Sequence, residues 1–237
     1  MWTTGVLRDT LSNTVAFSAV VVTLGMATGL LLALGLNRPG RFAGFVRSAV
    51  FSAYVVSWVS VALLWLWVLD ARAGILSALV RFLGLEPLDW LGDPAVALYT
   101  VAGVTLWKVA GYAMVIFLAG LQDIPRAFYE AAALDGARQW ACFWSITWPL
   151  LRPTAAFVAT TSLITSFQVF DVVRVMTQGG PVRSTTVFVY AIYEQVFLDL
   201  RVGRASALVV VFFLFLLGLT GLQWWVWRRG TAARTGR

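Results

Sequence analysis

Five long apolar runs, separated by more polar segments, dominate the pattern of hydrophobic and polar positions along this chain. A helix crosses a hydrocarbon core of about 30 Å with roughly 20 residues, and each run is long enough to do so. Lipid offers no partner to an unpaired backbone group, so spanning helices are the expected structure. The chain is therefore predicted to be an all-α polytopic membrane protein with about five transmembrane helices, at residues 12–36, 45–69, 95–120, 153–175 and 205–227.

Two segments between these spans are apolar but too short or too mixed to cross. Residues 74–84 are expected to form a short helix at the membrane interface, with Trp90 in the aromatic belt. Residues 185–197 are moderately apolar and are expected to enter the outer leaflet as a re-entrant helix.

The segment between the third and fourth runs carries the most specific signal. Glu130, Ala131 and Ala132 begin a helix-favouring stretch. Gly136 then interrupts it, and glycine accepts left-handed dihedral angles, so we predict a turn between two short helices there. We also expect Glu130 to lie near the helix N-terminus, where a carboxylate interacts favourably with the helix dipole. The plainer interpretation is an amphipathic helix that only connects two spans.

The spacing of Glu130-Ala131-Ala132, Gly136, Ile146 and Pro149 closely resembles the EAA signature of the membrane subunits of binding-protein-dependent ABC importers. Nine residues, 137–145, separate the glycine from the isoleucine, as in that signature; Trp148 replaces the usual leucine. The resemblance implies that residues 127–149 form a cytosolic coupling loop whose helix sits in a groove on the ATPase subunit, within a single permease domain, 1–237.

Two further stretches resemble the carbohydrate-uptake branch of the family, the maltose and glycerol-3-phosphate permease type. They are Phe167–Asp171 and the turn formed by Thr177 and Gly179-Gly180-Pro181. Asn13-Thr14 resembles an Asn-Thr pair that the family places after an additional span. The chain thus looks like a member without its first helix, and we expect either a late start site or a naturally shorter protein.

The resemblance also implies a set of partners and a location. The chain would pair with a second permease subunit, two ATPase subunits and an extracytoplasmic solute-binding protein, in the bacterial plasma (inner) membrane. It implies no cofactor. It does not identify the solute, nor which of the two permease subunits contacts it.

Composition narrows the alternatives. Hydrophobic residues make up 60% of the chain and charged residues 12%, as in a multi-pass membrane protein. The net charge of +7 does not indicate nucleic-acid binding, because the basic residues form no stripe or patch. Histidine is absent, which removes most metal sites and much acid–base catalysis. The only lysine, Lys108, lies outside any phosphate-loop motif, so ATP hydrolysis must come from a partner.

The distribution of basic residues predicts the orientation, because cytosolic loops carry more Lys and Arg. If the coupling loop is cytosolic, five spans place the N-terminus outside the cell and the C-terminus in the cytosol. On this assignment ten arginines face the cytosol and seven face outward. The inner set is Arg38, Arg41, Arg47, Arg126, Arg138, Arg152, Arg228, Arg229, Arg234 and Arg237, and the outer set is Arg8, Arg72, Arg81, Arg174, Arg183, Arg201 and Arg204.

Polar residues inside spans are costly and are candidates for function. Thr161, Thr165 and Gln168 share one helical face of the fourth span, and Asp171 continues that face. We interpret these four as a solute path; hydrogen bonding between packed helices is the alternative. Lys108, in the third span, is expected to extend to an interface or bind a carbonyl, and Gly25, Gly29 and Ala33 to form a packing face.

Two other classes of function fit the sequence less well. A stand-alone secondary carrier would need internal repeats or broken helices at the membrane midplane, and no clear repeat is present. A membrane-embedded lipid-linked transferase would need clustered acidic residues or histidines, whereas Asp70, Asp123 and Asp135 are isolated on different loops. No catalytic residue, metal site or cofactor is predicted.

Overall fold

The computed structural model describes residues 4–232, with side chains described from Leu7 to Gly221. Over this range every regular element is a helix. The elements are α1 Thr4–Leu36, α2 Arg41–Val55, α3 Trp58–Val68, α4 Ile75–Phe82, α5 Ala97–Gln122, α6 Arg126–Leu134, α7 Gln139–Cys142, the π-helical turn η1 Phe143–Thr147, α8 Trp148–Phe167, α9 Asp171–Met176, α10 Phe188–Tyr193, the π-helical turn η2 Glu194–Leu198, and α11 Val202–Ala232.

The chain divides into two compact units, Met1–Val187 and Phe188–Arg237, which are described separately. The prediction of one domain spanning 1–237 therefore stays a prediction. In the second unit, α10 packs on α11: the Phe188 ring stacks on Phe212, with 5.1 Å between ring centroids. The shorter apolar helix of this unit runs from Phe188 to Leu198 and overlaps the segment 185–197, which was expected to be re-entrant.

Helix α5 is the centre of the first unit. About two thirds of the residues in its most apolar stretch are buried, compared with about a fifth of those in α1. Helices α1, α2 and α8 all pack against α5. Met114 and Phe117 of α5 and Leu151 and Val158 of α8 are fully enclosed in the shared core.

Small residues set how closely these helices approach. A Cβ atom added at Gly29 would lie 2.5 Å from the Cβ of Ala113, and one at Gly111 would lie 2.5 Å from the Val50 carbonyl oxygen. The neighbouring Ala33 is fully buried. The predicted packing face on the first span is therefore confirmed, in the manner typical of membrane helices that approach through small residues.

The five-span prediction is confirmed, with two corrections to its boundaries. Four helical stretches are long and apolar enough to cross: Leu7–Leu36, Ala97–Gln122, Gln139–Met176 and Val202–Gly221. The second predicted span, 45–69, is wrong as one continuous helix. It breaks at Val56 and Ser57, and α3 departs from α2 at 102°. Counted as one broken span, the pair supplies the fifth.

The fourth predicted span, 153–175, also differs. Helix α8 ends at Phe167, and residues 168–170 separate it from the short helix α9. At its other end it starts earlier, at Trp148, directly after the π-helical turn. The amide of Trp148 bonds to the carbonyl of Phe143, five residues back. Pro149 has no amide hydrogen to offer the Ser145 carbonyl, so the backbone locally adopts the wider spacing.

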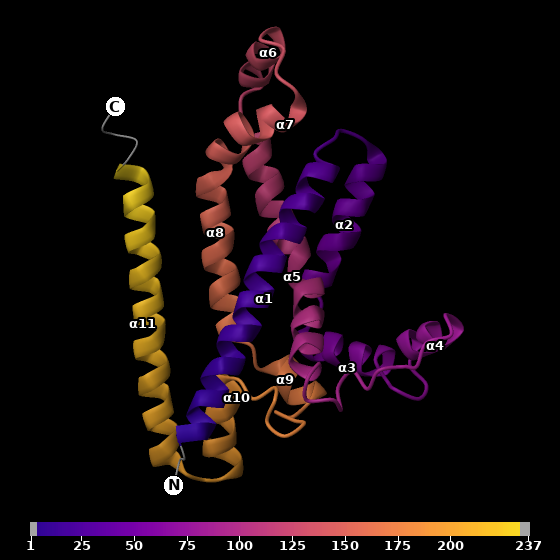
Figure 1. Ribbon diagram of the computed structural model, residues 1–237, viewed down its shortest axis with the longest axis vertical. Helices are drawn as coiled ribbons and strands as arrows, with labels where there is room; N and C mark the ends of the chain where they lie inside the picture. The colour runs from indigo at the N-terminus through magenta and orange to yellow at the C-terminus, as the bar shows by residue number, and fades with distance from the viewer. Residues whose placement is uncertain (1–3, 233–237) are drawn as a thin grey trace. The chain divides into compact units, whose positions relative to one another are not determined.

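Within the first unit, α6 and α7 lie at one end, beside the connection between α1 and α2 (Figure 1). Helices α3, α4 and α9 lie at the other end. The expected short helix at 74–84 is confirmed as α4, Ile75–Phe82. Arg38 and Arg41 thus share an end with the loop that holds Glu130.

Candidate functional site

The loop at the α6–α7 end contains the helix predicted to begin near Glu130. Helix α6 instead begins at Arg126, after Pro125 with φ −58°. Glu130 is the fifth helical residue, and the first turn holds no acidic side chain. The expected helix-dipole role of Glu130 is therefore wrong. Ala131 and Ala132 occupy the middle of α6, and Leu134 at its end is 90% exposed.

Gly136 forms the turn predicted between two short helices. Its φ is +73°, the left-handed region. The amide of Ala137 bonds to the Ala132 carbonyl at 2.9 Å, and the amide of Gly136 bonds to the Ala133 carbonyl at 3.1 Å. This pair of bonds is the Schellman arrangement, which satisfies the last carbonyls of a helix. Gly136 therefore fixes the direction in which the chain leaves α6.

The loop contacts the core through Tyr129, Ile146 and Trp148. The Tyr129 hydroxyl lies 2.9 Å from the Thr147 hydroxyl, which links α6 to the π-helical turn. Tyr129, Ile146 and Trp148 all pack against the core formed by α5 and α8. Pro149 is in the first turn of α8. Helix α6 is thus in direct contact with the residue that immediately precedes α8.

A second candidate region is a cavity of about 250 Å³ in the first unit. Side chains of the α8 end, of α9 and of the start of α3 line it. Thr165, Gln168 and Asp171 are all among the lining residues, together with Trp58. Gln168 is exposed, and Thr165 and Asp171 are half-buried.

Three of the four predicted path residues therefore meet in one cavity, and Thr161 does not line it. The Thr161 hydroxyl donates to the Phe157 carbonyl at 3.0 Å, and the Thr165 hydroxyl donates to the Thr161 carbonyl at 2.9 Å. Both hydroxyls bond within their own helix, so hydrogen bonding between packed helices does not explain them. The expectation that Asp171 continues the α8 face is wrong, because α8 ends first; Asp171 reaches the cavity from α9.

Lys108 lies deep in α5, 1% exposed. Its ammonium group donates to the carbonyl oxygens of Ala53 at 3.1 Å and Tyr54 at 2.9 Å, and to that of Val56. It also lies over the Trp58 ring, 4.8 Å from the centroid. The predicted bonding of Lys108 to a carbonyl is confirmed. Trp58 is not among the residues predicted from the sequence. It is one of several tryptophans in an apolar run, and nothing in its local pattern distinguishes it from the others.

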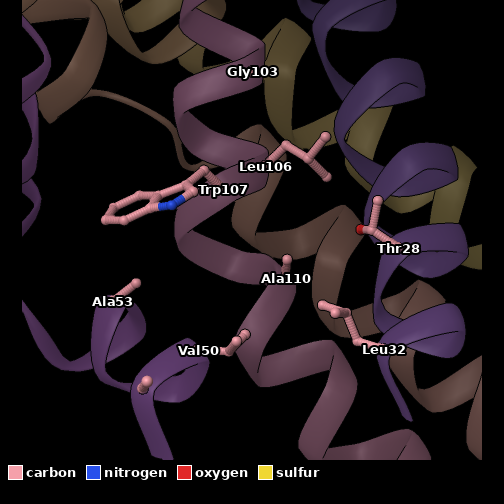
Figure 2. Close-up of a pocket in the computed structure, with 9 residues that line it drawn as sticks. Thr28, Leu32, Val50, Ala53, Gly103, Leu106, Trp107 and Ala110 are labelled. Atoms are coloured by element: carbon pink, nitrogen blue, oxygen red, sulfur yellow. The ribbon is translucent and has the colours of Figure 1, made fainter. Parts of the chain in front are cut away.

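A separate cavity, about 520 Å³, lies between α1, α2 and α5 and is lined mainly by apolar side chains. Figure 2 shows Leu32, Val50 and Ala110 around it, with Trp107 and Thr28 on either side. It offers few groups to hold a polar solute, so the cavity at Gln168 is the better candidate.

The loop that resembles the family's outer turn is held by threonine hydroxyls. The hydroxyls of Thr177 and Thr185 lie 2.7 Å apart, and Thr185 lies 2.7 Å from the Gly180 carbonyl oxygen. The Asn13 side-chain amide of α1 donates to the carbonyls of Arg183 and Thr186 at 3.1 and 3.3 Å. Asn13 therefore fastens this loop to the first span.

Replacing Asn13 with alanine is expected to lower the thermal midpoint of the purified protein by about 2–4 °C. Loss of these hydrogen bonds costs about 1 kcal/mol, and that is the usual shift for a chain of this size. Asn37→Ala, at an exposed position between α1 and α2, is the matched control for a thermal-shift measurement in detergent. Equal thermal midpoints for the two variants would show that the Asn13 hydrogen bonds do not stabilise the fold.

Comparison with known proteins gives concordant matches. A family model described as "Binding-protein-dependent transport system inner membrane component" matches residues 25–229. The sn-glycerol-3-phosphate transport system permease protein UgpA of Agrobacterium fabrum is 34% identical, over 91% of this chain and 73% of that protein. The osmoprotective compounds uptake permease protein GgtC of Synechocystis is 31% identical, over 86% of this chain and 75% of that protein.

A solved structure of a bacterial alginate ABC transporter, in complex with alginate pentasaccharide-bound periplasmic protein, contains a similar chain. The match has a TM-score of 0.82 and 25% identity, and covers 91% of this chain and 76% of that chain. The arrangement of helices described above is therefore shared with an ABC transporter chain.

Proposed function

This chain belongs to the binding-protein-dependent transport system inner membrane components, and from that premise we propose how it takes part in ATP-driven import. It supplies part of the solute path through the cavity at Gln168, and it receives the movement of a separate ATPase through α6. The observation that carries the proposal is that one chain holds both a polar cavity in its membrane-spanning unit and a helix at one end joined directly to α8.

The path is assigned to Thr165, Gln168 and Asp171, with Thr161 one turn along α8. Their hydroxyl, amide and carboxylate groups suit the hydroxyls of a polyol, and the Trp58 ring supplies an apolar face. Ionisable groups in a membrane-spanning chain are retained where they face a cavity or a partner, which supports a path rather than simple packing.

The solute class follows from the charge of that cavity. Its lining includes the carboxyl group of Asp171 and no basic side chain. Lys108, close behind Trp58, has three ammonium protons and three carbonyl acceptors, so it offers none to an anion. We therefore favour an uncharged sugar or polyol over a phosphate ester, although the relative from Agrobacterium is named for sn-glycerol 3-phosphate.

Thermal-shift screening of the cognate solute-binding protein tests this choice. Uncharged sugars or polyols are expected to raise its midpoint, and sn-glycerol 3-phosphate is expected to leave it unchanged. Stabilisation by sn-glycerol 3-phosphate alone would contradict the assignment of solute class and leave the path itself to be tested by mutation.

Coupling is assigned to the loop 127–149. Glu130, Ala131 and Ala132 present the middle of α6 to the ATPase groove, where alanine side chains permit close approach. Gly136 sets the exit of that helix, and Ile146 and Pro149 connect it to α8. The contacts that support this role are the Tyr129–Thr147 hydrogen bond and the packing of Ile146 on the core.

The working assembly in this proposal contains a second permease subunit, two ATPase subunits and an extracytoplasmic solute-binding protein. The chain of the alginate transporter comes from a complex with a periplasmic protein, which supports the last of these. ATP binding and hydrolysis belong to the ATPase subunits. Family membership favours this importer over the stand-alone carrier and the lipid-linked transferase.

The N-terminus is proposed to lie outside and the C-terminus in the cytosol. Cysteine introduced at the exposed position Ser12, in a Cys142→Ser background, is expected to react with an impermeant maleimide in intact cells. Native Cys142 is expected to react only after the cells are permeabilised. Labelling of Cys142 in intact cells would reverse the orientation.

A further inference from the structure

We propose that Lys108 is a positioning residue of the solute cavity: its ammonium group holds the break between α2 and α3 and thereby fixes Trp58 as a wall of that cavity. The proposal rests on the proposed path for the meaning of the cavity. The physical arrangement that it describes is measurable without any solute.

The break leaves backbone groups without helical partners. Helix α2 has 15 residues, about 22 Å at 1.5 Å per residue, which is short of a core of about 30 Å. Its last carbonyls have no amide beyond the break to bind, since Val56 is extended, with ψ 143°. Unpaired carbonyls in a lipid-surrounded protein are costly, so something in the fold must satisfy them.

Lys108 does so across a sequence separation of more than fifty residues. The carbonyls of Ala53, Tyr54 and Val56 converge on its ammonium group, one acceptor for each proton. A cation at a helix C-terminus is also stabilised by the helix dipole. Ala53 is buried and Lys108 is 1% exposed, so this contact is shielded from solvent.

The same ammonium group contacts the first residue of α3. Its nitrogen lies 4.8 Å from the centroid of the Trp58 ring and 5.8 Å from that of Tyr54, within the range of cation–π attraction. Trp58 in turn lines the cavity with Gln168 and Asp171, whereas Lys108 does not line it. Lys108 therefore acts on the cavity through Trp58 and through the position of the break.

Crosslinking of paired cysteines tests this arrangement. Trp58→Cys and Gln168→Cys are combined in a Cys142→Ser chain, and a short bifunctional thiol reagent is applied to the membrane-assembled protein. Because Trp58→Cys removes the ring, this pair reports the position that the carbonyl contacts of Lys108 give to residue 58. The fraction joined is measured by mass spectrometry of linked peptides. The control pair is Leu32→Cys with Ala110→Cys, two residues that face one cavity between α1 and α5 (Figure 2).

With Lys108 present, both pairs are expected to crosslink. Lys108→Met is expected to lower the 58–168 crosslink by about tenfold or more, because loss of even one of its three buried hydrogen bonds changes the population by about that factor, and to leave the 32–110 crosslink unchanged. Lys108→Arg, which keeps the charge and the donors, is expected to restore the 58–168 crosslink.

Two results would overturn the proposal. An unchanged 58–168 crosslink in Lys108→Met means that the break holds itself. Loss of both crosslinks, in protein that is inserted and recovered at normal yield, means that Lys108 supports the whole unit and has no particular relation to the cavity. Neither result depends on the identity of the solute, so failure of the proposed path is recognised separately, by mutation of Gln168.

Discussion

Replacing Gly136 with valine is expected to weaken association with the ATPase subunits by about 5- to 150-fold while the chain still inserts in the membrane. No atom lies within 4 Å of the position where a Cβ would stand, so the effect is not a clash. It arises from φ +73°, which a β-branched residue rarely adopts. A strained residue costs about 1–3 kcal/mol, and each 1.4 kcal/mol is tenfold in an equilibrium constant.

In Gly136→Val, the turn is expected to relieve that strain by breaking the amide–carbonyl hydrogen bonds to Ala132 and Ala133. The direction of α6 then changes. Two variants separate this effect from simple bulk. Gly136→Asn is expected to retain most ATPase binding, because asparagine tolerates the left-handed region. Gly35→Val places the same side chain in equally open space at an ordinary helical φ, and is expected to bind normally. Co-purification with a tagged ATPase subunit supplies the measurement.

Replacing Gln168 with leucine is expected to reduce solute uptake about tenfold without loss of complex assembly. The amide is exposed in the cavity, and removing a hydrogen bond to the solute costs about 1–1.5 kcal/mol, close to a factor of ten. Leucine is of similar size, so the end of α8 retains its packing.

Uptake of the solute identified by the binding-protein screen is measured per assembled complex. Thr23→Val is the control, since it removes a hydroxyl from another span: Thr23 bonds to the Ala19 carbonyl within α1. Reduced assembly with normal uptake per complex would show that Gln168 is a packing residue. The assignment of the path to this cavity would then be withdrawn.

The helical class, the number of spans and the turn at Gly136 follow from local information. Apolar length determines whether a segment can cross, and a glycine after Glu130-Ala131-Ala132 marks a helix end without any tertiary contact. The position of Glu130 within α6 was predicted wrongly, since the EAA pattern begins inside the helix. The local signal for the start of α6 is Pro125, because proline is favoured at the first positions of a helix, and α6 begins at the next residue.

The break at Val56 and the end of α8 at Phe167 depend on distant parts of the chain. No glycine or proline lies at 55–58 or 167–171, so local pattern gives no reason for either interruption. At Val56 the carbonyls left unpaired by the break are bound by Lys108, on another helix. Bringing Trp58 to Gln168 likewise requires the packing of α3 against α9. Helical periodicity therefore grouped Thr165 with Gln168, whereas only the tertiary structure brings Asp171, from α9, and Trp58, from α3, to the same cavity.

Affinity purification of the tagged chain from its own membranes tests the central claim most directly. The account predicts that the wild-type chain brings with it an ATPase subunit with a phosphate-loop motif. The recovered complex, reconstituted in liposomes with the loaded solute-binding protein, is predicted to hydrolyse ATP. Gly136→Val, inserted to the same level, is predicted to recover little ATPase and to lose the stimulation. A wild-type chain that purifies alone and drives solute uptake with an ion gradient would contradict the account.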